Sequence, residues 1–199
     1  MRHSALLIAV AVGTLMAAPV VMAQYANSGT ISSGGIPAQS RMPLGTTPAD
    51  IKIEGSSFAR KMAISDLFEI ESSNLALDRS NNNEVKAFAR TIAQNHAQST
   101  AKLKDAYMKS AISDPLPNKL DQEHAQEMAR LRGLPDAEFD YAYMLAQVED
   151  HQQAINLLQT YSLKGDNPLL RMFATEALPT VQMHLGDAQR LATPMNAAR

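Results

Sequence analysis

The feature that most constrains the fold is a helical repeat of apolar side chains, which recurs in four stretches between residues 57 and 191. In each stretch the apolar residues return every three or four positions, so they lie on one face of an α-helix. The first stretch runs from Ser57 to about Leu77, and its stripe is Phe58, Met62, Ser65, Glu69, Ser72 and Ala76. The second runs from Glu84 to about Ala111, and its stripe is Val85, Phe88, Ile92, His96, Leu103 and Tyr107.

Two further stretches follow with clear start and stop signals. Asp136 is the expected N-cap of the third, which runs to Lys164 and stops at Gly165. Its stripe is Phe139, Met144, Val148, His151, Ile155 and Leu158. Asn167 followed by Pro168 is a typical helix start for the fourth. Its stripe is Leu170, Phe173, Ala177, Val181, His184, Ala188 and Leu191.

Prolines divide the remaining sequence. Pro115 and Pro117 end the second stretch, and a shorter helix over about Lys119–Leu131 is expected to start at an Asn118 cap. Pro179 lies inside the fourth stretch and should kink or divide it. Four long amphipathic helices and a short connecting helix predict an all-α protein, a four-helix bundle whose connecting helix lies between long helices two and three.

The composition supports a helical domain and excludes several classes of protein. The chain has 199 residues, of which 45% are hydrophobic, which suits one globular domain with modest extensions. No cysteine is present, so disulfides, thiolate metal sites and cysteine nucleophiles are excluded. The formal net charge of -2 provides no basic field for binding nucleic acid.

The N-terminus has the three parts of a secretory signal peptide. Arg2 precedes an apolar run over Ala5–Ala18, and small residues at Val21 and Ala23 come before Gln24. We therefore expect residues 1–23 to direct export to a bacterial periplasm and to be removed, with an uncleaved membrane anchor as the alternative. No later apolar stretch reaches the roughly 20 residues needed to cross a bilayer.

The other predicted segments follow from composition. Residues 24–55 are rich in Gly, Ser and Pro and are expected to form a flexible linker. Residues 56–191 form the helical bundle. Residues 192–199 lack a periodic pattern and are expected to form a flexible tail.

Three of the five histidines lie in apolar stripes, each near the middle of a different long helix: His96, His151 and His184. His151 lies 15 residues before Asp166 and His184 lies 18 residues after it. At about 1.5 Å per residue, their heights in an antiparallel pair differ by only roughly 4 to 5 Å, so the two can meet. His124 on the connecting helix and His3 in the signal are not assigned to a site.

The first helix offers a carboxylate to this group, Glu69, with Glu71 as the alternative. Converging imidazole and carboxylate donors at mid-bundle would suit one ion of zinc, iron, copper or manganese, and imidazole favours the later transition metals. The same residues could instead form a structural His/Glu hydrogen-bond network in the core. The thioethers of Met144 and Met183 lie near His151 and His184 in sequence, and such soft donors would also suit copper.

Familiar catalytic motifs are not found. A di-iron oxidase site needs Glu three residues before a histidine, but Ala93, Val148 and Val181 occupy those positions. Four nearby acidic residues are expected on solvated faces: Glu149, Asp150, Glu176 and Asp187. The chain also lacks a nucleophile elbow, a phosphate-binding loop and a His-Glu-x-x-His motif. Catalytic residues are therefore not assigned.

Three blocks of sequence carry a family resemblance. They are Phe88–His96, then Glu138–Tyr141 with Gln147–His151, and Leu178–Leu185. They resemble an exported bacterial family with a domain of unknown function, whose members are often labelled outer membrane proteins. The resemblance spans about Ser57–Leu191.

The resemblance implies a ferritin-like bundle in which Pro115–Pro135 forms the crossover, and it brings no established activity. The family pattern usually has Asp before the histidine of the second helix, where this chain has Asn95. The outer-membrane label fits poorly, because the sequence shows no alternating strands of roughly 10 residues that could build a barrel.

Three functional hypotheses follow. The first is an exported periplasmic bundle that binds one metal ion through Glu69, His96, His151 and His184, or that serves in an envelope stress response. The second is a metal-free module that interacts with an envelope protein and contains a structural His/Glu core network. The third, a metal-dependent oxidase or hydrolase, ranks last, because it requires an open coordination position and substrate access that the sequence does not show.

Overall fold

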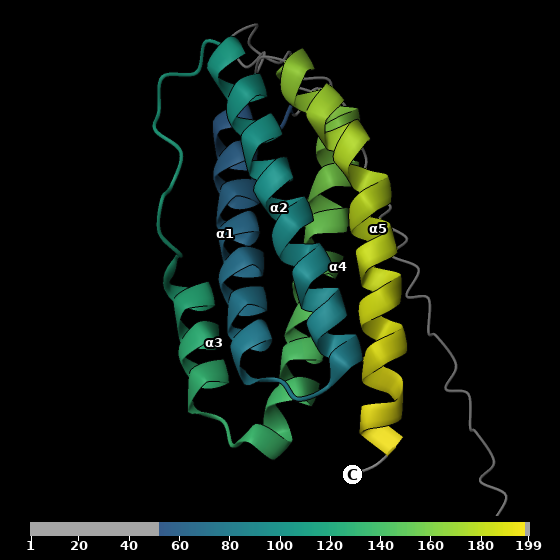
Figure 1. The fold of residues 1–199 in the computed structure, drawn as a ribbon. Helices are drawn as coiled ribbons and strands as arrows, with labels where there is room; N and C mark the ends of the chain where they lie inside the picture. Colours follow the sequence, from purple (N-terminus) through teal and green to yellow (C-terminus); the bar gives the residue numbers. More distant parts are fainter. Residues whose placement is uncertain (1–51, 198–199) are drawn as a thin grey trace, which may run out of the picture. The chain divides into compact units, whose positions relative to one another are not determined.

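A computed structural model describes residues 52–197, and it confirms the predicted all-helical bundle (Figure 1). Its elements are α1 (Gly55–Arg79), α2 (Asn83–Lys109), α3 (Gln122–Gly133), α4 (Asp136–Lys164) and α5 (Pro168–Ala197). Within this range, β pairing is limited to one parallel bridge between Ile53 and Gly165. The predicted signal peptide and most of the predicted linker lie outside the described residues.

The order of the helices gives the bundle one long crossover. α1 and α2 form one antiparallel hairpin, and α4 and α5 form another, each closed by a short turn (Figure 1). Between them, the chain returns along the bundle through residues 110–121 and α3, so α2 and α4 run in the same direction. α1 and α5 each pack against both α2 and α4. A single long crossover is the connectivity of ferritin-like bundles.

Two predicted helix starts are confirmed by their caps. The side chain of Asn82, the N-cap of α2, accepts a hydrogen bond from the backbone N–H of Glu84. At α5, Asn167 Oδ1 accepts hydrogen bonds from the backbone N–H groups of Leu169 and Leu170. Both side chains satisfy N–H groups that have no partner inside the helix.

Two other predicted caps are wrong. α3 starts after Asp121 rather than Asn118, because the Asp121 carboxylate accepts the backbone N–H of His124. Asp136 lies in the first turn of α4, after Pro135 at the N-cap position. The Asp136 carboxylate instead accepts a hydrogen bond from the Arg79 guanidinium at 2.6 Å, which joins the end of α1 to the start of α4.

The last helix is longer and more continuous than predicted. α5 is not divided at Pro179, because this proline is exposed and water can satisfy the carbonyl that it leaves unpaired. The helix also continues to Ala197, beyond the predicted bundle boundary at residue 191. None of the described helices is long and apolar enough to span a membrane.

The core contains two apolar clusters with polar residues between them. One cluster includes Phe88, Ile92 and Tyr143, and the other includes Phe58 and Leu158. Between them, the middle turns of the four long helices bury these polar side chains: Ser65, Asp66, Glu69, Ser72, Ser73, His96, Gln147, Asp150, His151 and His184. Burying so many polar groups is costly unless they are paired, so this layer is the candidate site.

Candidate metal centre

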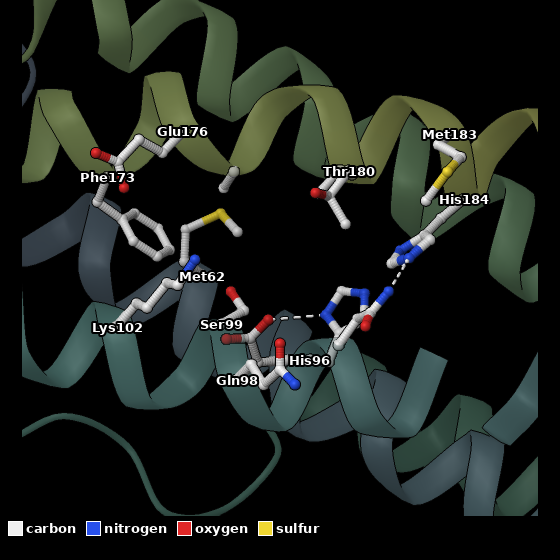
Figure 2. Close-up of a pocket in the computed structure, with 14 residues that line it drawn as sticks. Met62, His96, Gln98, Ser99, Lys102, Phe173, Glu176, Thr180, Met183 and His184 are labelled. Carbon is white, nitrogen blue, oxygen red and sulfur yellow. Dashed lines mark hydrogen bonds and ion pairs between the residues drawn. The ribbon is translucent and has the colours of Figure 1, made fainter. Parts of the chain in front are cut away.

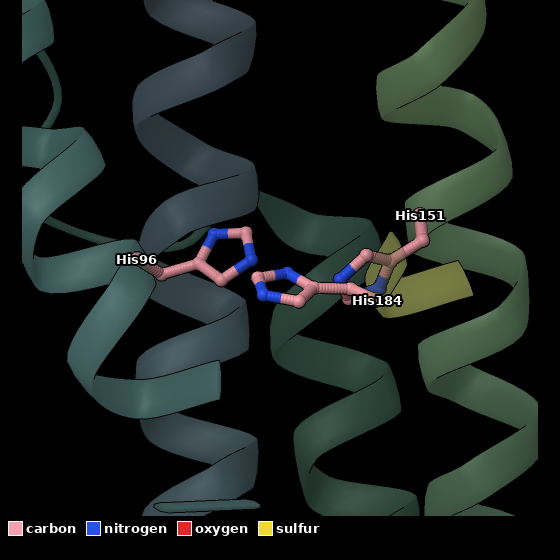
Figure 3. A group of neighbouring side chains, drawn as sticks. All are labelled: His96, His151 and His184. Carbon is pink, nitrogen blue, oxygen red and sulfur yellow. The ribbon is translucent and has the colours of Figure 1, made fainter. Parts of the chain in front are cut away.

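The three predicted histidines meet in the polar layer. His96 comes from α2, His151 from α4 and His184 from α5, and their residues are only 3%, 1% and 2% exposed. One ligand atom from each histidine lies within 4.8 Å of those of the other two (Figure 3). The centroids of the three rings are 5.4 to 5.5 Å apart. The position of each histidine near the middle of its helix therefore correctly predicted that the three rings meet.

Two of these rings donate a hydrogen bond outward through Nδ1. His96 Nδ1 donates to Asp66 Oδ1 at 2.8 Å, and Thr100 Oγ1 donates to the other oxygen of the same carboxylate. His151 Nδ1 donates to the backbone carbonyl of Gln147 at 2.8 Å. Since Nδ1 carries the proton in both rings, the neutral form of each has a lone pair on Nε2.

The third ring is held differently. Asn95 Nδ2 donates to His184 Nε2 at 3.0 Å, so this ring accepts its outer hydrogen bond. Among the described residues, the second nitrogen of each ring has no hydrogen-bond partner and is buried: Nε2 of His96, Nε2 of His151 and Nδ1 of His184. Each histidine therefore has one partnered and one unpartnered nitrogen.

The environment keeps two of the rings neutral at pH 7. Burial lowers the pKa of His151 to about 4, and the neighbouring His96 contributes to this shift. Burial also lowers the pKa of His184 to about 3, with further contributions from His151 and His96. Neutral imidazole is the form that binds metal, so no proton has to be displaced from a charged ring.

Glu69 is buried beside the histidines but does not join their converging atoms. Its Oε1 lies 3.4 Å from His151 Nδ1, the outward nitrogen of that ring. Neither carboxylate oxygen of Glu69 has a hydrogen-bond partner among the described residues. Burial raises the pKa of Glu69 well above its usual range, and the nearby Asp150 adds to the increase. The alternative, Glu71, is exposed and lies 3.6 Å from Arg132.

Asp66 was missed by the sequence analysis. It is fully buried on α1 and holds His96 in place. Its position was visible in the sequence, because it follows Met62 by four residues and precedes Glu69 by three. That spacing puts Asp66 on the same helical face as the apolar stripe.

The prediction that Asp150 lies on a solvated face is wrong. Asp150 is only 7% exposed, and it accepts hydrogen bonds from Ser65 Oγ at 2.7 Å and His124 Nε2 at 3.2 Å. His124, on α3, also donates from Nδ1 to Asp121. Because the crossover folds α3 against α1 and α4, it brings this distant histidine to the bundle. The other acidic residues, Glu149, Glu176 and Asp187, are exposed as predicted.

These contacts shift both pKa values. The hydrogen bond to Asp150 raises the pKa of His124 to about 9, although burial acts in the opposite direction. Burial alone would raise the pKa of Asp150, but hydrogen bonds from His124 and Ser65 lower it to about 2. The pair is therefore an ion pair at neutral pH.

A pocket of roughly 200 Å³ leads from the surface to the histidines between α2 and α5 (Figure 2). His96 and His184 line its inner end, and Asn95 lies beside them. Exposed side chains from both helices, including Lys102 and Thr180, form its outer part. The centre is therefore accessible from one side.

Two solved structures share this fold. CopM in its Cu(II)-bound form has a TM-score of 0.61 and 16% sequence identity, and the match covers 72% of this chain and 99% of that chain. A Streptomyces coelicolor protein with the DUF305 domain, described as secreted, has a TM-score of 0.59 and 20% identity. That match covers 74% of this chain and 92% of the other. At these identities the similarity establishes the fold alone.

Family membership comes from the sequence. None of the curated proteins compared with this chain matches it significantly. The domain of unknown function DUF4142 matches residues 42–191, which contain all three blocks of the family resemblance and all three core histidines. The chain therefore belongs to the DUF4142 family of domains of unknown function.

Proposed function

We propose that this protein binds one transition-metal ion through His96, His151 and His184. The proposal rests on the three unpartnered ring nitrogens, one from each histidine, buried where the rings converge. On the other side of each ring, a carboxylate, a carbonyl or an amide fixes its orientation. Metal-binding histidines generally donate such an outer hydrogen bond, as His96 and His151 do here.

A purely structural network, as in a metal-free envelope interaction module, is a weaker interpretation. Buried polar atoms that serve only stability are almost always hydrogen bonded. Here the described residues leave three ring nitrogens and both oxygens of Glu69 without partners. A metal ion would satisfy the three nitrogens, and a proton on the buried Glu69 carboxyl would remove the cost of its charge.

The donor set favours copper or zinc over the other predicted ions. Imidazole suits both, whereas manganese prefers carboxylate and water ligands. Non-haem iron sites usually include a carboxylate ligand, but Glu69 lies against the outward nitrogen of His151. We assign Glu69 to supporting His151 rather than to the ion. The shared fold with CopM, solved in a Cu(II)-bound form, is consistent with copper.

Elemental analysis tests the proposal directly. The mature protein, purified without an affinity tag and incubated with Cu(II) or Zn(II), should retain about one ion per chain after dialysis. The His96→Ala/His151→Ala/His184→Ala variant should retain none, while His124→Ala, which changes a histidine outside the cluster, should retain the ion. Absence of retained metal in the wild type, or equal retention by the triple variant, would overturn the proposal.

We also propose that the protein acts in the periplasm after removal of residues 1–23. The charged start, the apolar run and the small residues before Gln24 support this location. Intact-mass measurement of protein from the periplasmic fraction should give a chain that begins at Gln24. A full-length mass, or recovery only from the cytoplasm, would contradict export and cleavage.

A further inference from the structure

The pocket between α2 and α5 reaches two of the three proposed ligands. His96 and His184 are buried at its inner end, whereas Gln98, Lys102 and Thr180 are exposed around its outer part (Figure 2). The pocket is large enough, at roughly 200 Å³, for a molecule of a few heavy atoms. It therefore provides a route from solvent to the place where the unpartnered nitrogens converge.

The protein provides three donors at this place and leaves room for a fourth. Among the described residues, the group that could hold an ion consists of the three histidines. Glu69, the predicted fourth ligand, faces the outward nitrogen of His151. Zinc in catalytic sites has three protein ligands and an open position for water or substrate, and the pocket gives such access here.

The charges around the pocket favour an anion. Imidazole ligands would leave the charge of a divalent ion uncompensated. Lys102 adds a positive charge, and Figure 2 shows its side chain reaching across the pocket towards Met62. None of the ion pairs found in the described part of the chain involves Lys102. Two acids also line the wall: Asp66 is hydrogen bonded to His96, and Glu176 is exposed on α5.

We propose that this pocket binds a small monoanion that coordinates the metal ion at its open position, with Lys102 as the charge partner of the anion. The inference rests on the proposed metal site and adds the class of its external ligand. Met62, Phe173 and Val181 provide apolar wall on the inner side, so a small carboxylate fits as well as an inorganic anion. Thr180 is an exposed residue of α5 that lines the same pocket as His96 and His184 (Figure 2).

Azide binding to the Cu(II)-loaded mature protein tests this assignment. Titration with sodium azide should produce a saturable azide-to-copper charge-transfer absorption. Thr180→Phe fills the pocket and should weaken azide binding at least about tenfold, while the copper content stays at one ion per chain. Thr175→Phe is the matched control, because Thr175 is an exposed threonine on α5 that does not line the pocket.

A second pair of variants tests the charge. Lys102→Gln should weaken azide binding about two- to fivefold, the range expected for one exposed charge pair. Lys104→Gln removes a lysine from the same helix outside the pocket and should bind azide as the wild type does. This pair keeps the test valid if Thr180→Phe does not fold.

The outcomes separate this inference from the proposed metal site. Failure of the wild-type protein to retain copper would overturn the proposed metal site itself. A copper-loaded protein with no azide absorption keeps the metal site and overturns the anion site. Equal azide affinity in the wild type and Thr180→Phe would overturn this pocket as the route, and equal affinity in Lys102→Gln would overturn Lys102 as the charge partner.

Discussion

Asn95 donates a hydrogen bond from Nδ2 to Nε2 of His184 at 3.0 Å. Because Nε2 accepts this bond, neutral His184 carries its proton on Nδ1, the nitrogen that is otherwise unpartnered. His96 and His151 have the opposite arrangement, with their protons on the outward Nδ1. Metal binding through Nδ1 of His184 therefore requires the ring proton to move to Nε2 and the Asn95 amide to turn, so that its oxygen accepts a hydrogen bond from Nε2–H.

This relationship predicts that Asn95→Asp strengthens metal binding. A carboxylate can only accept, so it would hold the proton of His184 on Nε2 and leave Nδ1 free for the ion. We expect the dissociation constant for Cu(II), measured by chelator competition, to fall about tenfold, since outer hydrogen-bond partners alter metal affinity by this order. Gln94→Glu is the control, because it adds the same charge at a neighbouring exposed position of α2. Affinity no higher than that of the control would refute the prediction.

Asp66 should be needed for stability even without metal. It is fully buried and accepts hydrogen bonds from His96 and Thr100, so Asp66→Ala leaves one buried and one half-buried donor unpaired. We expect the free energy of unfolding, measured with urea, to fall by about 2–4 kcal/mol. Asp66→Asn retains an acceptor and should lose less. Asp105→Ala removes an exposed aspartate and should change stability by no more than about 0.5 kcal/mol.

The ion pair between His124 and Asp150 should make stability depend on pH. The pKa of His124 rises from 6.5 to about 9 on folding, so its contribution is fully present below pH 6.5. It is lost as the pH rises through about 9. Between these limits, we expect the wild type to lose on the order of 1–3 kcal/mol more stability than His124→Gln, which cannot titrate.

Urea unfolding of both proteins at several pH values between 6 and 9.5 measures this difference. Groups that do not contact His124 titrate alike in both proteins, so their contributions cancel in the comparison. Parallel pH profiles for the wild type and His124→Gln would show that the contact with Asp150 does not stabilise the folded state.

Substitution of Gly165 should destabilise the protein because its surroundings leave no space for a side chain, and not because of its backbone angle. Its φ of −64° is open to any residue, but an added Cβ would lie 2.5 Å from the ring of Tyr161. That ring is fully buried and stacks on Phe58, so it cannot move aside. We expect Gly165→Ala to lower the free energy of unfolding by about 1–3 kcal/mol.

Gly186→Ala is the matched substitution. A Cβ at Gly186, within α5, would meet no atom within 4 Å. The change should raise stability by up to about 1 kcal/mol, because alanine favours the helix. Thermal unfolding followed by circular dichroism compares the two variants, and equal midpoints would contradict the packing argument.

Much of the fold could be predicted because the helices follow from the local periodicity of apolar residues. The stripes of Phe58, Ile92, Leu158 and Leu170 fix which face of each long helix is buried, and the Asn167 cap marks the start of α5. The positions of some helix ends depend instead on distant contacts. Asp136, for example, is drawn into a hydrogen bond with Arg79 across the bundle instead of capping α4.

Only part of the candidate site could be predicted from the sequence. His96, His151 and His184 lie in stripes at compatible heights, so their convergence followed from the helical rise of about 1.5 Å per residue. The sequence could not assign Asp66 to His96, because which neighbouring helix faces each ring depends on the packing of α1 against α2. For the same reason it could not show that Glu69 lies against the outward nitrogen of His151.

The sequence by itself therefore determined the helices, their buried faces and the depth of the three histidines, because these depend on residue spacing along one helix. Only the tertiary structure decided which nitrogens are free, because the partners Asp66, Asn95 and the Gln147 carbonyl are fixed by side-chain geometry. It also decided that His124 joins Asp150, since the long crossover folds α3 back onto the bundle. Local periodicity sets each helix, and contacts across the bundle set the chemistry.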